Sequence, residues 1–485
     1  MDIKKCLIIA PHQDDEVLLA GNLIQLLSAS GTDVRVLFST NGDWKYSPEV
    51  RIREAIKSLE ILGNIPKEHI ILLGYSDNYI DDKHSHYYYA GSGSVKSVSG
   101  HGETYGACGI SDFAFAQSGE HSKYNKVAFV DDLKNAILSV NADLIVCIDF
   151  DEHPDHKMLS LSFEEALGMI LSENSHYRPI VLKGFAYCTG YTAINDFFER
   201  RLGSTVIPKV GEIEKYHYEM INTSVYEWKN RICIPAPERS RSRNLLKNVK
   251  ARALAQHKTQ YVVLRAPQII NSDEVFWLRR TDSISYSAEV ATSSGNGKYL
   301  NDFQLLNVND IDSINPHFCD YLWSPSDEKK EARFTWKVPQ TISQVRIYGN
   351  AQGDGRILKI LISFDNGYVV ECGPLPDKGN VLVLNVEKQM NVTWCLLQIL
   401  ECVGSDCGIA ECEFFETQEF DKAIEFSEWV SSIPKGSGDD LKKVDFLISN
   451  LYLKCISTRQ LFGRTISFVK RHGAKGIMKR LLQGK

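Results

Sequence analysis

Two short clusters of histidine and acidic residues stand close behind apolar runs of this chain. The first, Pro-His-Gln-Asp-Asp-Glu at 11–16, follows the run 6–10, and the second, His-Pro-Asp-His at 153–156, comes shortly after the run 144–148. Short apolar runs predict buried strands, and ligands of open α/β folds bind beyond the carboxyl ends of the strands. Imidazole and carboxylate groups are side chains that bind zinc. The pair of clusters therefore predicts a metal site.

The spacing within the clusters suggests which residues would hold the ion. His12 and Asp15 are three residues apart just beyond a strand, so both can face one point, and His156 is the best third ligand. Two histidines and one aspartate leave the fourth position of tetrahedral zinc open to water, as in catalytic sites. Bound zinc lowers the pKa of that water toward about 7. Asp14 then stands as the candidate general base.

The remaining residues of the second cluster complete a hydrolytic site. His153 is the candidate that stabilises an oxyanion or protonates a leaving group, and Asp155 is expected to fix its tautomer. Together these groups predict attack of water on a carbonyl or phosphoryl group. The alternative is that Asp14 or Asp15 only caps a helix beginning near Val17. The occurrence of two clusters favours the metal site.

Alternating strand-like and helix-like segments through the first 190 residues must position these groups. They predict an α/β domain, residues 1–290, with a Rossmann-like, doubly wound and mostly parallel sheet. In that order the first and fourth strands are neighbours, which brings the two clusters together. The expected strands are Cys6–Ala10, Val34–Ser39, Ile70–Leu73, Leu144–Ile148 and Val181–Tyr187, and the expected helices are Val17–Ser30, Val50–Leu62, Val130–Ser139 and Leu159–Leu171.

A long segment rich in Gly, Ser, His and Tyr, residues 77–128, interrupts this alternation. Long loops of this kind are usually functional or disordered. Its position between the third and fourth strands predicts a lid over the site. His101 and Tyr105 are its candidates for contact with substrate.

The second half of the chain has a different pattern. The Ser-, Thr- and Gly-rich residues 291–297 are expected to be a linker, as is Pro434–Gly438. Between them, residues 298–420 predict a β-sandwich of the jelly-roll type. Its expected strands are Ala332–Val338, Gln344–Gly349, Leu358–Phe364, Val369–Cys372, Val381–Val386, Trp394–Leu400 and Ala410–Phe415. Residues 440–485 have the periodicity of a short helical tail.

Charge is distributed unevenly along the 485 residues. The chain has a net charge of −6, but residues 441–485 carry eleven Lys or Arg and one acid, so the remainder is strongly acidic. The acidic body disfavours a nucleic-acid partner. The basic amphipathic tail either packs on the body or lies on an anionic membrane surface.

Apolar content points to a cytoplasmic protein. No apolar stretch is long enough for a transmembrane segment, and no secretory signal is recognised. We therefore expect a cytoplasmic location, with peripheral contact at the inner face of the membrane if the tail binds lipid.

Four cysteines lie close together, but their spacing lacks a C-x-x-C pair, which disfavours structural zinc. They are Cys395, Cys402, Cys407 and Cys412.

The two clusters resemble those of the PIG-L-type (LmbE-like) zinc-dependent N-acetylglucosamine deacetylases. The resemblance extends over roughly residues 1–285, through Ser39–Asp43, Arg51–Glu54, Leu73–Asp77, Ala253–Gln260 and Asp273–Trp277. It implies removal of the acetyl group of an amino sugar, with zinc as the metal, although iron(II) fits the same ligands. The substrate would be an amino sugar in a glycolipid or polysaccharide precursor.

The same resemblance implies roles for single residues. His12, Asp15 and His156 match the zinc ligands, Asp14 the catalytic base and His153 the group that stabilises the tetrahedral intermediate. Arg51 and Asp77 fall where the family contacts the sugar. Gln13 stands where many members have proline, which is expected to loosen the turn while leaving the ligands in place.

The second domain resembles discoidin-type jelly rolls, on the residues 348–349, 362–367 and 408–414. Such modules often bind glycans, and a purely structural role is the alternative. Two other functions stay open: a zinc amidase acting on a non-sugar acyl-amine, and an inactive protein that binds glycans.

Overall fold

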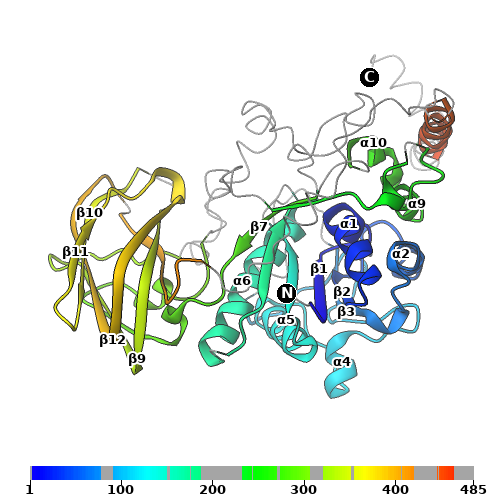
Figure 1. Cartoon of the computed structure of the whole chain (residues 1–485). Coiled ribbons are helices and arrows are strands. Elements are labelled where there is room, and N and C mark those ends of the chain that lie inside the picture. The colour runs from blue at the N-terminus through cyan, green and yellow to red at the C-terminus, as the bar shows by residue number, and fades with distance from the viewer. Residues whose placement is uncertain are drawn as a thin grey trace, which may run out of the picture.

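The computed structural model describes most of the chain. The described residues are 3–77, 91–149, 153–174, 176–186, 232–242, 244–269, 274–305, 321–350, 354–405, 407–419, 445 and 447–463. They form an α/β domain, an all-β domain on one side of it, and a helix on the opposite side (Figure 1). An α/β fold followed by an all-β fold and a short helix agrees with the fold class that the sequence predicts.

The sheet of the α/β domain has the strand order β3-β2-β1-β4-β5-β7-β6. Five strands are parallel: β1 (Lys5–Ala10), β2 (Asp33–Thr40), β3 (Ile70–Tyr75), β4 (Leu144–Ile148) and β5 (Ile180–Gly184). The edge is antiparallel, because β7 (Glu274–Arg279) pairs antiparallel with β5 and β6 (Ile232–Ile234) antiparallel with β7. The sheet is thus mixed, and β1 lies next to β4, as the sequence predicts.

Helices cover this sheet in two groups. On one side α1 (Asp15–Ala29), α2 (Pro48–Gly63) and α9 (Val249–Leu254) contact one another, and on the other α5 (Lys126–Val140) contacts α6 (Pro154–Glu173). The chain changes sides at the β1–β4 pair, which makes this pair the switch point where ligands bind. Shorter pieces are α4 (Phe113–Ser118), α10 (Ala266–Ile269), η1 (Lys67–His69), η5 (Glu238–Ser240) and η6 (Val262–Arg265).

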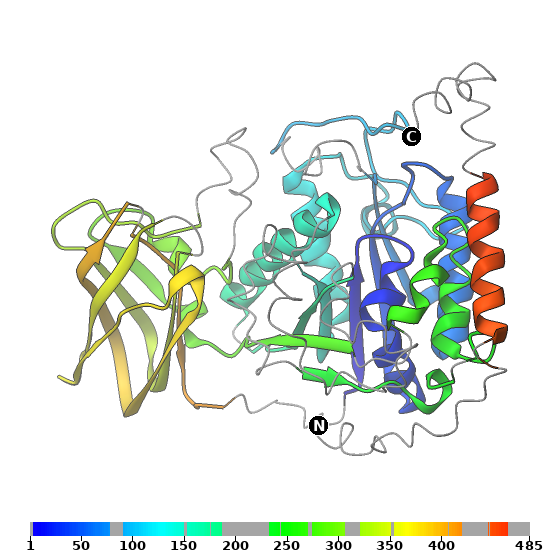
Figure 2. The same cartoon turned by 90° about the horizontal axis from the view of Figure 1, so that it is seen from above.

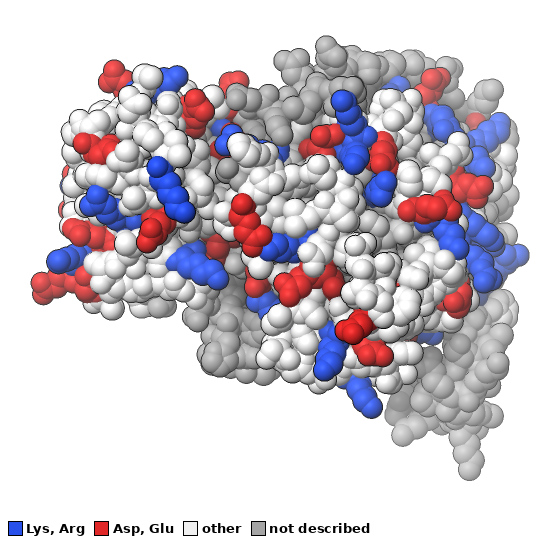
Figure 3. Space-filling view, turned by 90° about the horizontal axis from the view of Figure 1, so that it is seen from below, with Lys and Arg blue, Asp and Glu red and all other residues white. Residues whose placement is uncertain are grey.

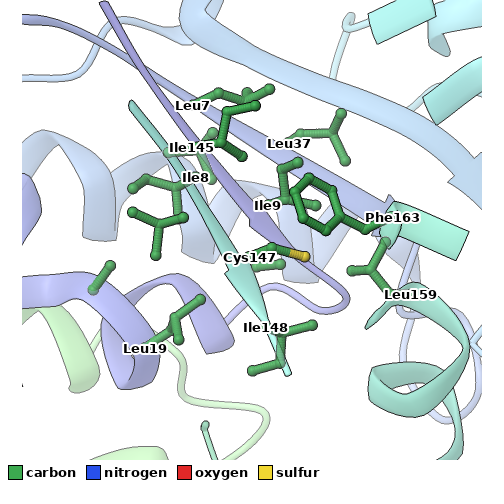
Figure 4. Close-up of a cluster of buried hydrophobic side chains, with 14 of the residues drawn as sticks. Leu7, Ile8, Ile9, Leu19, Leu37, Ile145, Cys147, Ile148, Leu159 and Phe163 are labelled. Carbon is green, nitrogen blue, oxygen red and sulfur yellow. The ribbon is translucent and has the colours of Figure 1, made fainter. Parts of the chain in front are cut away.

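The core beneath the switch point is aliphatic. Ile8, Ile9, Ile145 and Ile148 are fully buried, and Ile9 lies beside Phe163 of α6 (Figure 4). Near-continuous apolar strands are expected of a sheet that is covered on both faces. The two central strands are therefore held firmly, and so are the turns that leave their carboxyl ends.

A buried ion cluster ties α6 to the sheet. Lys183 of β5 donates to Ser160 at 2.8 Å and to Glu164 at 2.9 Å, and its Nζ lies 3.3 Å from Asp149 Oδ1. Asp149 directly follows β4, so the cluster joins the ends of two strands to the helix that carries His156. Its Lys183 side chain is only 1 % exposed.

Removal of this cation should destabilise the fold. Lys183→Met leaves two buried carboxylates without their nearest cation, so we expect the free energy of unfolding to fall by about 3 kcal/mol. Urea unfolding measures this change. Lys134→Met is the control, because Lys134 pairs with the exposed Glu173 and should cost less than about 1 kcal/mol. Equal losses in the two variants would contradict the argument.

The all-β domain is one antiparallel sheet folded around its own core. Its strands are β8 (Glu289–Thr292), β9 (Glu331–Gly349), β10 (Arg356–Phe364), β11 (Val369–Cys372), β12 (Val381–Val403) and β13 (Ile409–Phe415), with the turns η7 (Ile284–Ser287), η8 (Gly297–Leu300) and η10 (Asp377–Gly379). One cluster of buried side chains contains Phe334 and Leu397 from one half of the sheet and Ile347 and Phe414 from the other.

Three expectations for this domain are corrected. The predicted linker 291–297 is wrong, because Ala291 and Thr292 belong to β8, which pairs with β9, and Gly297 begins η8. Two expected pairs of strands are single long strands, β9 and β12. Register shifts between Asn385 and Trp394 bend the pair without ending it. The linker at 434–438 lies outside the described residues.

The two domains share a polar and aromatic interface. Arg279 of β7 lies 4.2 Å above the ring of Phe303, and its Nη1 is 3.7 Å from Glu164 Oε1 on α6. Arg280 lies 3.8 Å above the ring of Phe415 and pairs with Asp282 at 2.8 Å. The all-β domain therefore packs directly on the α/β domain.

A helix spanning residues 447–463 lies beside α9 on the far edge of the α/β domain (Figure 2). It falls within the predicted tail, whose remaining residues lie outside the described part. Among the described residues no helix is both long and apolar enough to cross a membrane.

Candidate metal-binding active site

The first cluster forms the turn between β1 and α1. The backbone N–H groups of Asp14 and Asp15 donate to His12 O at 3.1 and 3.3 Å, which curls the chain so that the three side chains converge. Asp14 occupies the N-cap position of α1, but its side chain accepts no helix N–H. The helix-cap alternative therefore does not explain this carboxylate.

The second cluster begins α6. His153 is the N-cap residue, and its Nδ1 accepts the backbone N–H of Asp155 at 3.1 Å. Proline at the first helical position suits this start, since its missing N–H would have had no partner there. Asp155 and His156 then lie in the first turn, and both are buried.

The three predicted metal ligands meet at one oxygen atom. Asp15 Oδ2 lies 3.1 Å from His12 Nδ1 and 3.1 Å from His156 Nε2. Ligand atoms about 2.1 Å from a tetrahedral zinc ion lie about 3.4 Å apart, so this spacing fits a shared ion. The other oxygen, Asp15 Oδ1, is buried and has no hydrogen-bond partner among the described residues. The donor set thus fits a divalent metal.

A second group of possible donors gathers on the other side of the His12 ring. His12 Nε2 donates to Asp155 Oδ2 at 3.1 Å and lies 3.8 Å from Asp77 Oδ1. These atoms and a ring nitrogen of His153 are close enough together to bind an ion themselves. In metal sites a ligating histidine commonly donates its other N–H to a carboxylate, which is what Asp155 does for His12 if the ion lies at Nδ1.

The expectation for Asp155 therefore changes. Its backbone N–H, rather than its carboxylate, holds His153 Nδ1, while its Oδ2 bonds to His12. The helix start imposes this arrangement, because residue 155 is two positions after the N-cap. Asp155 fixes both rings, one through the main chain and one through the side chain.

The charges of the site leave room for a cation. Burial lowers the pKa of His12, but Asp77, Asp15 and Asp155 together hold that pKa well above its usual value. Burial raises the pKa of Asp15, but His156 and His12 outweigh it and hold that pKa well below the usual range. In the absence of metal, a proton on His12 lies beside Asp15. Metal binding releases protons from its ligands, so a metal ion could replace this proton between the two side chains.

Asp14 is held apart from these ligands by Arg51. Arg51 Nη2 donates to Asp14 Oδ1 at 3.0 Å and to Gln13 O at 3.1 Å, and Nη1 donates to Asp77 Oδ2 at 3.4 Å. Burial raises the pKa of Asp14 to about 6 in spite of Arg51. Arg51 and Asp77, expected from the resemblance to contact a sugar, here bond to one another and to Asp14.

His153 has a defined tautomer. Since Nδ1 accepts the N–H of Asp155, the proton of the neutral ring is on Nε2. Burial, together with His12 and His156, holds the pKa of His153 well below its usual value, which keeps the ring neutral. The ring centroid lies 4.6 Å from that of His12, so a neutral N–H donor stands beside the predicted ligands.

Two neighbours of the ligands differ from expectation. Gln13 is fully buried and its amide donates to Thr40 O at 2.6 Å, so it ties the turn down and does not loosen it. Gly42 permits this packing, because it has φ +64° and a Cβ there would lie 2.4 Å from Gln13 Oε1. Glu16, in the first turn of α1, pairs with buried His257 at 2.8 Å, a contact that the motif does not predict.

The described part of the expected lid is anchored by Asp43. Its Oδ2 accepts the Tyr105 hydroxyl at 2.8 Å and the hydroxyl of Ser99, and its Oδ1 accepts the N–H of Asp77 at 2.9 Å. The rings of His101 and Tyr105 are stacked with centroids 4.0 Å apart. Residues 78–90 of the lid lie outside the described residues. Asp43 was not named as a site residue from the sequence. Its position would have suggested it, because Asp43 comes shortly after β2, as the first cluster, residues 11–16, comes after β1.

Comparison with known families divides the chain in the same way as the fold. Residues 7–167 match the model of the PIG-L family, described as GlcNAc-PI de-N-acetylase. Residues 288–415 match a domain of unknown function, DUF7402. The discoidin resemblance is therefore not confirmed. No curated protein matches the chain.

Several solved structures are similar at low identity. The N,N'-diacetylchitobiose deacetylase of Pyrococcus horikoshii is 16% identical over 58% of this chain and 85% of its own, with a TM-score of 0.28. A deacetylase of teicoplanin biosynthesis is 16% identical over 57% and 99%, with a TM-score of 0.33. For the all-β part, a family 32 carbohydrate-binding module from C. perfringens NanJ is 16% identical over 26% and 92%, with a TM-score of 0.19.

Proposed function

We propose that this protein is a metal-dependent hydrolase that removes the N-acetyl group from an N-acetylhexosamine unit of a glycoconjugate or polysaccharide precursor. The observation that carries the proposal is the meeting of His12, Asp15 and His156 at one carboxylate oxygen, with Asp14 held beside them by Arg51. The PIG-L domain at residues 7–167 supports the reaction class.

Each residue of the site has a separate role in the proposed reaction. Zinc, or iron(II), held by His12, Asp15 and His156 would supply Lewis acidity that makes a neutral water more acidic. Asp14 takes up a proton from the attacking water while the new C–O bond forms. His153 donates its Nε2–H to the acyl oxygen as negative charge builds there. The C–N bond then breaks, and the proton taken up by Asp14 passes to the leaving amine, giving acetate and a free amino sugar.

The stacked pair of His101 and Tyr105 is the proposed sugar-facing part of the lid. Both belong to a segment that Asp43 joins to Asp77, and Asp77 contacts His12. This chain of contacts connects the lid to the metal ligands. Because His101 and Tyr105 are proposed to contact the sugar and are not among the proposed metal ligands, a change in the lid should alter binding of the substrate more than the chemical step.

Loss of one lid contact should weaken substrate binding. Tyr105→Phe removes the hydroxyl that donates to Asp43, so we expect KM to rise about fivefold with kcat nearly unchanged. Steady-state kinetics measure both constants. Tyr368→Phe in the all-β domain is the control and should change neither. An unchanged KM in Tyr105→Phe would remove the argument for the lid.

Mass spectrometry across a substrate panel tests the proposal. Metal-loaded protein is incubated with lipid-linked and nucleotide N-acetyl sugars and, in parallel, with N-acyl amines that contain no sugar. The proposal expects a product with one acetyl group replaced by hydrogen among the sugars. Turnover of the non-sugar amines alone would indicate a general amidase, and no turnover with stoichiometric metal would favour an inactive glycan-binding protein.

A further inference from the structure

The helix at residues 447–463 exposes large apolar side chains on the face that points away from the body. Leu447, Leu451, Leu461 and Phe462 are 60%, 54%, 66% and 64% exposed. At 100° per residue these four positions fall on one face of a helix. We call this face, Leu447, Leu451, Leu461 and Phe462, the outer apolar face. Large apolar side chains that are exposed on one face of a helix often mark an interaction site.

The opposite face of the same helix is already occupied. Tyr452, Leu453 and Ile456 pack against the main hydrophobic core. Ser449 Oγ accepts the N–H of Leu245 at 3.1 Å, and Asp445 accepts the Asn244 amide at 3.1 Å. The helix is thus fixed to the α/β domain through this face. The outer apolar face points the other way and does not pack into the core of that domain.

Charge identifies the partner. Residues 446–485 contain nine Lys or Arg and no Asp or Glu, and two of the nine, Lys454 and Arg459, are exposed on the helix itself. Figure 3 shows further Lys and Arg side chains at the right-hand edge of the molecule. This is the edge at which α2 lies in Figure 1. Two copies of such a surface would repel one another, whereas an anionic surface would attract it. Nucleic acid would satisfy the charges but would leave four apolar side chains in water.

We propose that the outer apolar face docks on an anionic lipid surface. Helices that combine Leu and Phe on one side with flanking Lys and Arg lie in the membrane interface, held by apolar burial and by attraction to anionic lipid. One end of this helix lies on the side of the molecule where the described part of the lid also lies (Figure 2). Docking would bring the candidate active site near the lipid surface. The proposal does not depend on the reaction catalysed there.

Sedimentation with lipid vesicles tests the docking. Full-length protein should bind vesicles of phosphatidylcholine with phosphatidylglycerol, bind pure phosphatidylcholine vesicles far more weakly, and dissociate at high salt. Leu451→Glu and Phe462→Glu should each lower the partition coefficient about tenfold or more. Val338→Glu is the matched control, because Val338 is 65% exposed on the all-β domain, and it should bind as the wild type does.

Point variants are preferable to deletion of the tail, because deletion would uncover the core residues beneath the helix. Thermal unfolding of each variant shows whether the fold is intact, and exposed positions should leave it unchanged. Absence of binding to anionic vesicles, or unchanged binding of both Glu variants, would overturn the proposal. Concentration-dependent dimerisation that Leu451→Glu abolishes would also overturn it, because a second copy would then be the occupant.

Discussion

Replacing Asp14 by Asn is expected to lower kcat by about a thousandfold while the protein keeps its metal. An amide retains an oxygen that can accept from Arg51 Nη2, so the 3.0 Å contact that positions residue 14 can persist. It cannot take up a proton from water, however. The variant therefore separates the function of the base from the architecture of the site.

Acetate release and metal content, measured on one preparation, check this expectation. Asp132→Asn is the matched control, because Asp132 is also a buried carboxylate but accepts the Tyr75 hydroxyl at 2.8 Å, within the core. It should keep both activity and metal. Near-normal turnover in Asp14→Asn would show that another group is the base, and loss of metal would place residue 14 among the ligands.

His156→Ala is expected to lose the metal and, with it, all measurable turnover. The site offers two overlapping donor groups that share His12, one including Asp15 and His156 and the other including Asp77 and Asp155. Removal of a ligand from a three-residue site leaves too few donors for tight binding. Variants of His12 cannot separate the two groups, since both groups contain this residue.

Asp77→Asn is the matched comparison for His156→Ala. If the ion lies at the shared oxygen of Asp15, Asp77→Asn keeps stoichiometric metal and His156→Ala does not, as elemental analysis of the purified variants measures. The reverse result would place the ion on the Nε2 side of His12. Zinc titration in the presence of a competing chelator gives the loss of affinity in each variant.

The elements that carry the site could be predicted because their sequence patterns are strong. The apolar runs at 6–10 and 144–148 became β1 and β4, and helix α6 contains the predicted span 159–171. Their adjacency followed from the usual order of a doubly wound sheet. The candidate metal ligands could be expected to lie close together because one cluster follows β1 directly and the other begins shortly after β4.

Contacts between distant segments could not be predicted in this way. The antiparallel strand β7 pairs with β5 across nearly a hundred residues, and the Glu16–His257 pair joins the first helix to the end of the domain. Periodicity does not specify such partners. The continuous β9 and β12 were divided in the prediction because polar residues interrupt their alternation, although hydrogen bonding continues through the bends.

Side-chain partners within the site were also beyond the sequence. Asp155 was assigned to His153, yet its carboxylate bonds to His12 and its main chain bonds to His153. Arg51 was assigned to substrate, yet its guanidinium reaches Asp14 and Asp77. Both outcomes depend on the angle at which α1, α2 and α6 leave the sheet, which a linear motif does not encode.

The proposed reaction requires a metal at the meeting point of His12, Asp15 and His156 for removal of an acetyl group from an amino sugar. The most direct test is acetate release from N-acetylhexosamine substrates by full-length protein, before and after chelation and again after zinc or iron(II) is restored. We expect acetate release to stop with chelation and to return with the metal. Full acetate release by protein that elemental analysis shows to be free of metal would contradict this expectation.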